Sequence, residues 1–550
     1  MKLNIIYIFL IISLPFFSKG QMAMDTILLS EVLLKEKKII NYMIGGRIES
    51  ISPILLGKSN SLLLSEYLFK NGSIYIKQYG ALATPSFRGT AATHTLFLWN
   101  DIPLNSLSTG LIDVSLLPTN SFNNIQIAYG SSSSAFGSGA VGGSIHLNNT
   151  IDFKLINKIN ITSEIGTYGL HVNQLDLKYA NNKYYSSIIF NRLTNDNNFS
   201  FINTTKMNSP LEYYNNASIK SDNLQCVFAY KYNKNNILET HFWKLNSFRE
   251  IPGNMAISNS SAEQYDNAIR LLLKSKHIIG GGKINLKIAR MEEDFSYIDE
   301  LKSIDSKILA ESYIANVDYT YYFNQTNLNF GVASTLNNIE SNNYRHSPKR
   351  ESEKSIYASS KIYYKRFAAN FSLRKQINSI NEIPLIPSFG FKQKLFNNFT
   401  ILAKTNKSYR TPTFNERFWI GLGNNNLLPE NGWNNEVGLD IGSNDLKIRA
   451  TIFSLKVKDW IQWIPNEGGF WSPENIKQVW SRGLEFNFHF KKKINNIKGL
   501  LYINYQYNIS TNEKGINKLD NSIGKQLIYT PYHKGNINIV IKDKNFSFLF

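Results

Sequence analysis

The sequence predicts a membrane β-barrel that follows a mixed α/β domain at the N-terminus. First, apolar and polar residues alternate through roughly 400 residues after residue 150, where helical periodicity is nearly absent. Second, the 550 residues include 34 Phe, 30 Tyr and 8 Trp, yet the mean hydropathy is −0.25. That composition is expected where lipid-facing residues alternate with polar residues of a lumen. Third, the chain begins with an export signal.

The export signal occupies residues 1–20. Lys2 precedes an apolar run over residues 3–17, and small residues stand one and three positions before Gln21, which predicts cleavage after Gly20. The run is too short for a membrane anchor, since a spanning helix needs about 20 apolar residues. No later stretch is long enough either. An exported chain of this kind is expected to be a secreted soluble protein or a β-barrel.

Residues 31–150 are predicted to form the mixed α/β domain, after a short leader at residues 21–30. Residues 61–69 have the pattern of a short amphipathic helix, and residues 74–80 and 95–99 have that of strands. The domain ends in a run dense in serine and glycine over residues 130–143. Glycine tolerates positive φ and close backbone approach, which tight turns in a confined domain require.

Two other interpretations of the glycine-rich run are weaker. A phosphate-binding loop is disfavoured because no G-x-x-x-x-G-K-[ST] pattern occurs and no strand–loop–helix unit follows. A flexible linker is disfavoured by Phe136, Val141 and Ile145, which are apolar residues that a packed segment would bury.

Residues 151–550 are predicted to form the barrel. Alternating segments are clear at residues 313–321, 446–452 and 484–490, and we count about eighteen or nineteen strand-like segments in all. A soluble β-sandwich or β-propeller would also alternate. Repetition at hairpin spacing, with aromatic residues near the strand ends, favours the membrane.

Several motifs resemble those of TonB-dependent outer-membrane receptors. Arg88-Gly89-Thr90 is followed by the strand at 95–99, Tyr129-Gly130 and the sequence G-S-G-A-V-G-G-S-I at residues 137–145, as in the plug domain of that family. Residues 408–418 and 481–485 resemble its barrel signature. The resemblance implies a plug inside the lumen of a 22-stranded barrel. It also gives the expectation that this chain lacks the last three or four strands.

The resemblance implies three groups of site residues. The TonB box, which pairs as an added β-strand with the energising protein TonB, would be Asp25, Thr26, Ile27, Leu28, Leu29 and Ser30. Ligand-binding apical loops of the plug would comprise Tyr79, Gly80, Leu82, Thr84, Asn105, Ser106, Leu107, Ser108 and Thr109. Structural positions of the plug would be Arg88, Gly89, Gly137, Gly139, Gly142 and Gly143.

The implied function is active import of a scarce nutrient across the outer membrane of a Gram-negative bacterium. Residues 88–96 are similar to the cobalamin-receptor branch of the family, so cobalamin or a related organometallic compound is the expected cargo. A ferric siderophore is the alternative within transport, and a passive porin or adhesion barrel is the alternative from another class. The implied partners are TonB with its inner-membrane complex, the nutrient and outer-membrane lipid.

Enzyme and nucleic-acid functions are disfavoured. The sequence has no G-x-S-x-G, H-E-x-x-H or P-loop motif, so we expect no catalytic residues. We expect no cofactor and no metal site, because His94 and His146 are better explained as structural histidines. The formal charge of +19 comes from dispersed Lys and Arg residues, which argues against nucleic acid as a partner.

Overall fold

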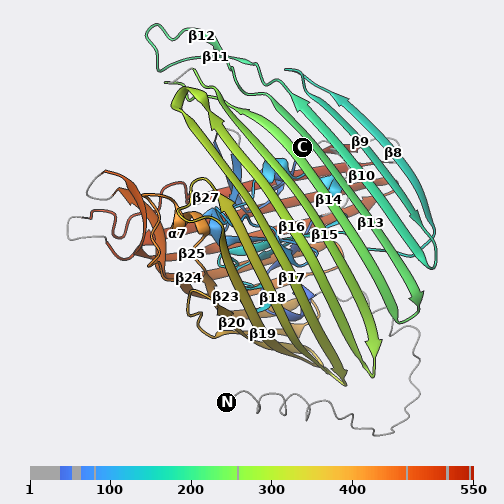
Figure 1. The fold of residues 1–550 in the computed structure, drawn as a ribbon. Helices are drawn as coiled ribbons and strands as arrows, with labels where there is room; N and C mark the ends of the chain where they lie inside the picture. Colours follow the sequence, from blue (N-terminus) through green and yellow to red (C-terminus); the bar gives the residue numbers. More distant parts are fainter. Residues whose placement is uncertain are drawn as a thin grey trace.

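The computed structural model describes residues 38–51, 63–79, 82–256, 259–465, 469–515, 520–543 and 547–549. The predicted signal peptide, the leader with the TonB box at 25–30, and Gly80 lie outside these residues. Figure 1 shows an N-terminal domain, in blue, surrounded by long tilted strands.

The N-terminal domain, which we call the plug, is built on a five-stranded sheet in the order β1-β6-β7-β4-β5. β4 and β7 run parallel, whereas the other neighbours are antiparallel. Its elements are α3 (Lys38–Tyr42), β1 (Ile48–Ser50), α5 (Leu64–Asn71), β2 (Tyr75–Tyr79), β3 (Leu82–Ser86), η1 (Ala92–His94), β4 (Thr95–Trp99), β5 (Ile102–Pro103), η2 (Val114–Leu116), η3 (Thr119–Ser121), β6 (Asn124–Tyr129), α6 (Ser133–Phe136) and β7 (Gly143–Asn148).

The helix and strands expected in the plug are present. The amphipathic helix predicted at 61–69 is α5, displaced toward the C-terminus, and its Leu64, Tyr67 and Leu68 are buried at i, i+3 and i+4 spacing. The strand predicted at 95–99 is β4, whose five residues are all buried. Phe97 and Trp99 pack with apolar side chains of β6 and β7 in one core cluster, whereas Leu96 and Leu98 belong to a second cluster on the other face.

Nineteen strands among the described residues form one antiparallel barrel sheet around the plug. They are β8 (Ile156–Ile165), β9 (His171–Ala180), β10 (Tyr184–Asn195), β13 (Ile219–Asn233), β14 (Asn236–Ile251), β15 (Ala262–Ile279), β16 (Gly282–Asp299), β17 (Ile304–Phe323), β18 (Thr326–Ser341), β19 (Lys349–Tyr364), β20 (Phe367–Asn378), β21 (Ile386–Phe396), β22 (Phe399–Arg410), β23 (Glu430–Gly442), β24 (Leu446–Pro465), β25 (Trp471–Ile494), β26 (Ile497–Asn512), β27 (His533–Lys542) and β28 (Ser547–Leu549). The number agrees with the count of strand-like segments in the sequence.

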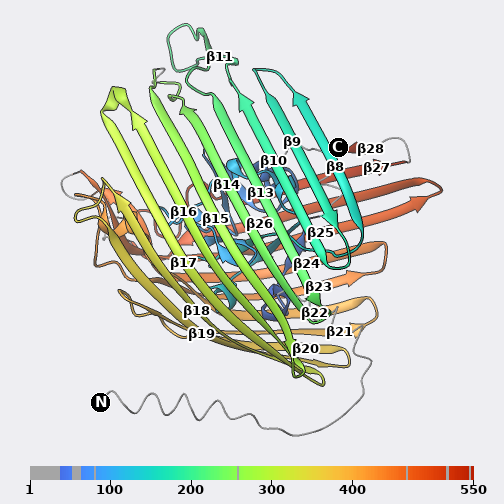
Figure 2. The ribbon, with the colours of Figure 1, turned by 45° about the vertical axis from the view of Figure 1, so that its right-hand side comes forward.

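The strand order follows the chain from β8 to β28 and brings β28 beside β8 (Figure 2). Outside this sheet, β11 (Ser200–Ile202) and β12 (Leu211–Tyr213) form a hairpin, and two further helices are η4 (Glu300–Lys302) and α7 (Phe414–Phe418). The expectation that the chain lacks three or four strands of a 22-stranded barrel stays a prediction.

The alternation along the strands separates two faces. In β17, Tyr313 and Val317 are exposed, whereas Asp318 and Thr320 are buried against the interior. Such an outward apolar and inward polar arrangement is typical of barrels whose outer surface meets lipid. In the described part of the chain, no helix has both the length and the apolar character needed to cross a bilayer.

The two ends of the barrel differ. At one end, which we call the short-turn end, hairpins turn over two or three residues, as at 181–183, 234–235 and 324–325. At the other, the long-loop end, connections include 411–429 and 513–532. Each part of the plug can therefore be placed by the end of the barrel that it lies nearer to.

Candidate functional site

A buried cluster of arginine and glutamate side chains ties the plug to the barrel. Arg88 forms a bidentate contact with Glu485 of β25, with Nε–Oε1 and Nη2–Oε2 distances of 2.9 Å. A third nitrogen, Nη1, lies 2.9 Å from Glu436 of β23. Burial alone would lower the pKa of the Arg88 guanidinium, but Glu485 and Glu436 raise it above the usual value. The cation therefore stays charged between its two carboxylates.

Arg47 joins the same cluster from the start of the plug. Its Nη1 donates to Glu485 at 3.0 Å, and its Nη2 donates to Glu49 at 3.1 Å. The Arg47 guanidinium also lies over the ring of Tyr129, 3.7 Å from the centroid. Two cations from the plug thus share a carboxylate of the barrel. We call Arg47, Arg88, Glu436 and Glu485 the plug lock.

Gly89 sits beside the plug lock where no side chain fits. Its φ is +68°, and a Cβ atom there would lie 2.1 Å from Ser510 Oγ and 2.4 Å from Asn508 Nδ2 of β26. The backbone of the neighbouring residue is held by the same strand, because Ser510 Oγ donates to the carbonyl of Arg88 at 3.4 Å. Glycine is required here both for backbone conformation and for space.

The variant Gly89→Val is expected to loosen the plug, increasing its rate of tryptic cleavage by about tenfold or more because both strain and overlap must be relieved. Limited proteolysis of the folded protein measures this. Gly469→Val is the matched control, since Gly469 has φ +79° but nothing within 4 Å of the added atom. Equal cleavage rates in the two variants would contradict the importance of space at Gly89.

The other predicted glycine positions divide into two kinds. Gly142 and Gly143 are crowded, since an added Cβ would lie 2.3 Å from Thr90 Oγ1 and 2.6 Å from the Phe87 ring, respectively. Gly137 and Gly139 have positive φ but looser surroundings. The turn that contains them is attached to the barrel, because Gly139 N donates to Tyr409 O at 3.1 Å and Thr411 N donates to Ser138 Oγ at 2.9 Å.

The plug segment 105–110 lies at the long-loop end. Asn105 fixes its base, accepting from Phe97 N at 2.8 Å and donating to Thr95 O and Gly110 O, each at 2.9 Å. Its tip contacts the long loop 411–429, because Phe414 N and Asn415 N donate to the carbonyls of Leu107 and Ser108. Leu107 also packs on an apolar cluster that includes Phe414, whereas Thr109 is exposed.

The second predicted loop is the turn of the β2–β3 hairpin. Tyr79 and Leu82 are opposite each other in its register, and the turn between them is outside the described residues. Thr84 is buried, and Leu82 is partly buried. The hairpin approaches the long loop 513–532, since Lys77 Nζ lies 4.0 Å from the ring centroid of Tyr529.

A cavity of about 230 Å³ lies between segment 105–110 and the barrel wall. Of the residues in the two predicted loops, Asn105, Ser106 and Leu107 line it, whereas Leu82 and Thr84 do not. Charged side chains of the wall and of α7 also line it, among them Glu351, Glu353, Arg374 and Arg410 of the wall and Arg417 of α7. The two predicted apical loops therefore do not contribute equally to this space. Their role in ligand binding stays a prediction.

A second buried charge cluster, which the sequence did not predict, lies at the long-loop end. His94 Nε2 lies 2.6 Å from Glu430 of β23, which also pairs with Arg410. Arg410 in turn contacts Glu416 through both terminal nitrogens, at 2.9 and 3.0 Å. His94 is fully buried, as a structural histidine would be, but it has a carboxylate partner that sequence spacing does not reveal.

A model described as the TonB dependent receptor-like β-barrel matches residues 117–542, and one described as the TonB-dependent receptor plug domain matches residues 43–144. A relative is the vitamin B12 transporter BtuB of Vibrio vulnificus (strain YJ016), 22% identical over 445 residues that cover 75% of this chain and 67% of that protein.

Solved structures show the same architecture. The siderophore receptor PirA from Pseudomonas aeruginosa gives a TM-score of 0.70 at 12% identity, covering 91% of this chain and 89% of that one. The FrpB iron transporter from Neisseria meningitidis gives 0.73 at 13% identity, covering 91% and 85%. At such identities the likeness establishes the fold alone.

Proposed function

Because this chain belongs to the TonB-dependent receptor family, we propose that it binds a scarce nutrient at the cell surface and imports it actively across the outer membrane of a Gram-negative bacterium. The observation that carries the proposal is a plug fixed within the barrel by the plug lock, with segment 105–110 presented to the long loops. A solute that enters from the long-loop end meets the plug and must displace part of it to pass. Such a step needs an energy source, which TonB would supply.

The proposed division of the chain follows from the same reasoning. A signal peptide at 1–20 and a leader at 21–30 with the TonB box would precede a plug at 31–150 and a barrel at 151–550. The first plug residue that the structure describes, Lys38, lies near the short-turn end, where it contacts Asp318 of β17 at 3.1 Å. This is the end that would face TonB.

Cobalamin, or a related organometallic compound, is the cargo that we propose. The similarity of residues 88–96 to the cobalamin-receptor branch supports this choice, and so does the relationship to a vitamin B12 transporter. A ferric siderophore is the second candidate, because structurally similar receptors carry siderophores or iron. A passive pore is disfavoured by the fixed plug.

Titration of the purified, folded receptor with cobalamin is expected to give saturable binding, detected as a change in tryptophan fluorescence and by calorimetry. A panel of ferric siderophores is titrated in parallel. Binding of a siderophore alone would replace the proposed cargo and leave the importer. A folded receptor that binds none of these compounds would contradict both cargo assignments.

A variant locates the site. Thr109→Phe places a bulky ring on the exposed tip of segment 105–110 and is expected to weaken cobalamin binding by about tenfold, as displacement of a well-packed contact does. Asn444→Phe in an exposed turn at the opposite end is the control. Equal affinities in the two variants would contradict the assignment of segment 105–110 to ligand binding.

A further inference from the structure

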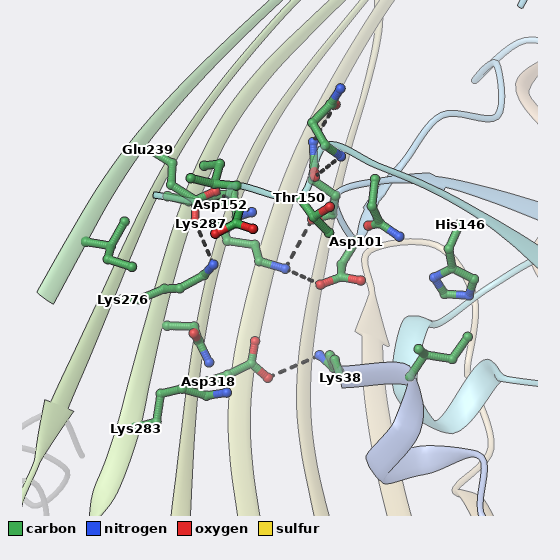
Figure 3. A pocket seen from close by; sticks show the side chains of 18 of the residues that line it. Lys38, Asp101, His146, Thr150, Asp152, Glu239, Lys276, Lys283, Lys287 and Asp318 are labelled. Carbon is green, nitrogen blue, oxygen red and sulfur yellow. Dashed lines mark hydrogen bonds and ion pairs between the residues drawn. The ribbon is translucent and has the colours of Figure 1, made fainter. Parts of the chain in front are cut away.

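A second and larger cavity, of about 730 Å³, lies between the plug and the barrel near the short-turn end. We call it the inner cavity. It is bounded by α3 and β7 of the plug and by the inner face of β13 to β18 (Figure 3). Two of its lining residues mark this end, since Asn182 lies in the short turn 181–183 and Lys231 lies on β13 just before the turn 234–235. Its volume is that of a pocket for a small organic molecule.

The lining of the inner cavity is strongly basic. Seven lysines line it against four carboxylates, which gives an excess of three positive charges. Its histidine, His146, is buried within hydrogen-bond distance of Ser144 Oγ, at 2.9 Å. A concave, poorly solvated space with one predominant sign of charge attracts ions of the opposite sign.

The carboxylates of the inner cavity are already engaged. Glu239 holds two ammonium groups, Lys274 at 2.7 Å and Lys276 at 2.6 Å. Asp318 is paired with Lys38. Asp152 accepts from the backbone N–H of Lys154 at 3.3 Å. Each of these carboxylates therefore has a cationic or N–H partner beside it, which reduces its repulsion of an incoming anion.

Asp101 completes this set of carboxylates. Its Oδ2 lies 2.5 Å from Lys287 Nζ, which also donates to Asn100 O at 3.2 Å. Burial alone would raise the pKa of Asp101, but Lys287 holds it well below the usual value. The excess of lysines therefore persists with every carboxylate ionised. Figure 3 shows Lys276, Lys283 and Lys287 on adjacent strands of one wall.

Other lining groups suit a solute that is partly organic. Side-chain amides such as those of Asn148, Asn182 and Asn285 can donate to oxygen, and Ile151 and Phe153 add apolar surface. Ammonium and amide donors around a restricted volume are the groups that bind phosphate and carboxylate oxygens. Lipid is excluded as the occupant because the inner cavity is separated from the bilayer by the strands.

We propose that the inner cavity is an anion-binding site for solutes that bear a phosphate or a carboxylate group. In the transport cycle it would receive the anionic part of the cargo after it leaves the long-loop end and before release at the short-turn end. That placement rests on the proposed function, whereas the anion site itself does not. A positively charged cavity between the surface site and the short-turn end would favour passage of anionic nutrients over neutral ones.

Calorimetric titration of the full-length receptor with inorganic pyrophosphate at low ionic strength tests the site. Saturable binding is expected, weakened about tenfold in the double variant Lys276→Gln/Lys283→Gln. Glu239 keeps Lys274 as its partner in this variant. The charge-matched control is Lys447→Gln/Lys498→Gln, at exposed positions outside the inner cavity, and its affinity is expected to match that of the wild type.

The result that overturns the inference is pyrophosphate binding that is absent from the wild type, or equal in the cavity variant and the control. Heat-dependent electrophoretic mobility checks that each barrel is folded. If the double variant does not fold, Lys276→Gln and Lys283→Gln are measured singly, and each is expected to lower the affinity for pyrophosphate about threefold.

An uptake assay separates the cargo from free phosphate as the occupant. Slower uptake in the cavity variant with unchanged surface binding supports the cargo, and unchanged uptake overturns that placement. The two proposals fail separately. If the receptor imports its nutrient but binds no pyrophosphate, the anion-site proposal fails and the proposed import function stands. If pyrophosphate binds in a lysine-dependent manner but no nutrient is imported, the anion site stands and the proposed import function fails.

Discussion

Replacing Arg88 with methionine is expected to destabilise the seated plug by about 3–5 kcal/mol. Removal of one partner from a buried ion pair costs this much because it leaves the other charge uncompensated in a poorly solvated interior. Here the guanidinium serves Glu485 and Glu436, both of which are buried. Arg47 remains beside Glu485, at 3.0 Å, so the uncompensated charge in Arg88→Met is chiefly that of Glu436.

Hydrogen exchange of peptides from β6 and β7, measured by mass spectrometry, reports this change. We expect exchange to accelerate by about 10²–10⁴-fold if these strands open by release of the plug. The control is Arg290→Gln, which breaks an exposed pair with Glu292 and Glu311 on β16 and β17 and should leave the plug unchanged. Unaltered exchange in Arg88→Met would show that the plug lock does not hold the plug.

A double variant separates loss of charge balance from loss of packing. Arg88→Met/Glu436→Met removes an ion pair and leaves Arg47 between Glu485 and Glu49, its two partners in the wild type. Apolar replacement of a complete buried pair is often neutral, whereas removal of a single partner is not. The double variant is therefore expected to exchange more slowly than Arg88→Met alone. Faster exchange in the double variant than in Arg88→Met would show that the plug depends on packing of the Arg88 guanidinium rather than on charge balance.

The sequence predicted the elements whose signal is local. Alternation located the barrel strands and their approximate number, and an apolar run defined residues 95–99 as the strand that the structure contains at the same bounds. The helix predicted at 61–69 begins at Leu64, three residues after the predicted start. The start was misplaced because Leu63, the residue before the helix, makes no side-chain cap that would mark it. The local sequence pattern thus predicts whether an element is a helix or a strand better than it predicts where the element begins and ends.

The charge clusters could not be predicted because their members are distant in sequence. Arg88 and Glu485 are 397 residues apart, and His94 and Glu430 are 336 apart. Alternation indicates that Glu485, between Leu484 and Phe486, faces the lumen, but not which plug residue it meets. The same holds for the inner cavity, whose lysines come from α3, from the segment between β7 and β8, and from β13, β15 and β16, and converge only when the sheet curves around the plug.

Deletion of Asp25–Ser30 is expected to abolish energised uptake while leaving surface binding of the nutrient intact. A strand-forming segment before a folded domain can pair with a partner's sheet through its backbone, and ligand binding would shift its availability. The first described element of the plug, α3, is held by Lys38–Asp318 and by Tyr42 Oη donating to Asn329 at 2.6 Å. Among the contacts of the described residues, these come first along the chain, so tension on the leader is expected to act on them, at the edge of the inner cavity.

A single-residue pair sharpens this test because it keeps the length of the leader. Leu28→Pro removes a backbone N–H that strand pairing uses, whereas Leu28→Val retains it together with β propensity. Uptake of labelled cobalamin by whole cells is expected to fail in the first variant and persist in the second, with equal binding at the surface. Since neither change touches the described plug or barrel, a loss in Leu28→Pro isolates energy coupling from ligand recognition. Undiminished uptake in both Leu28→Pro and the deletion would place the TonB contact elsewhere in the chain.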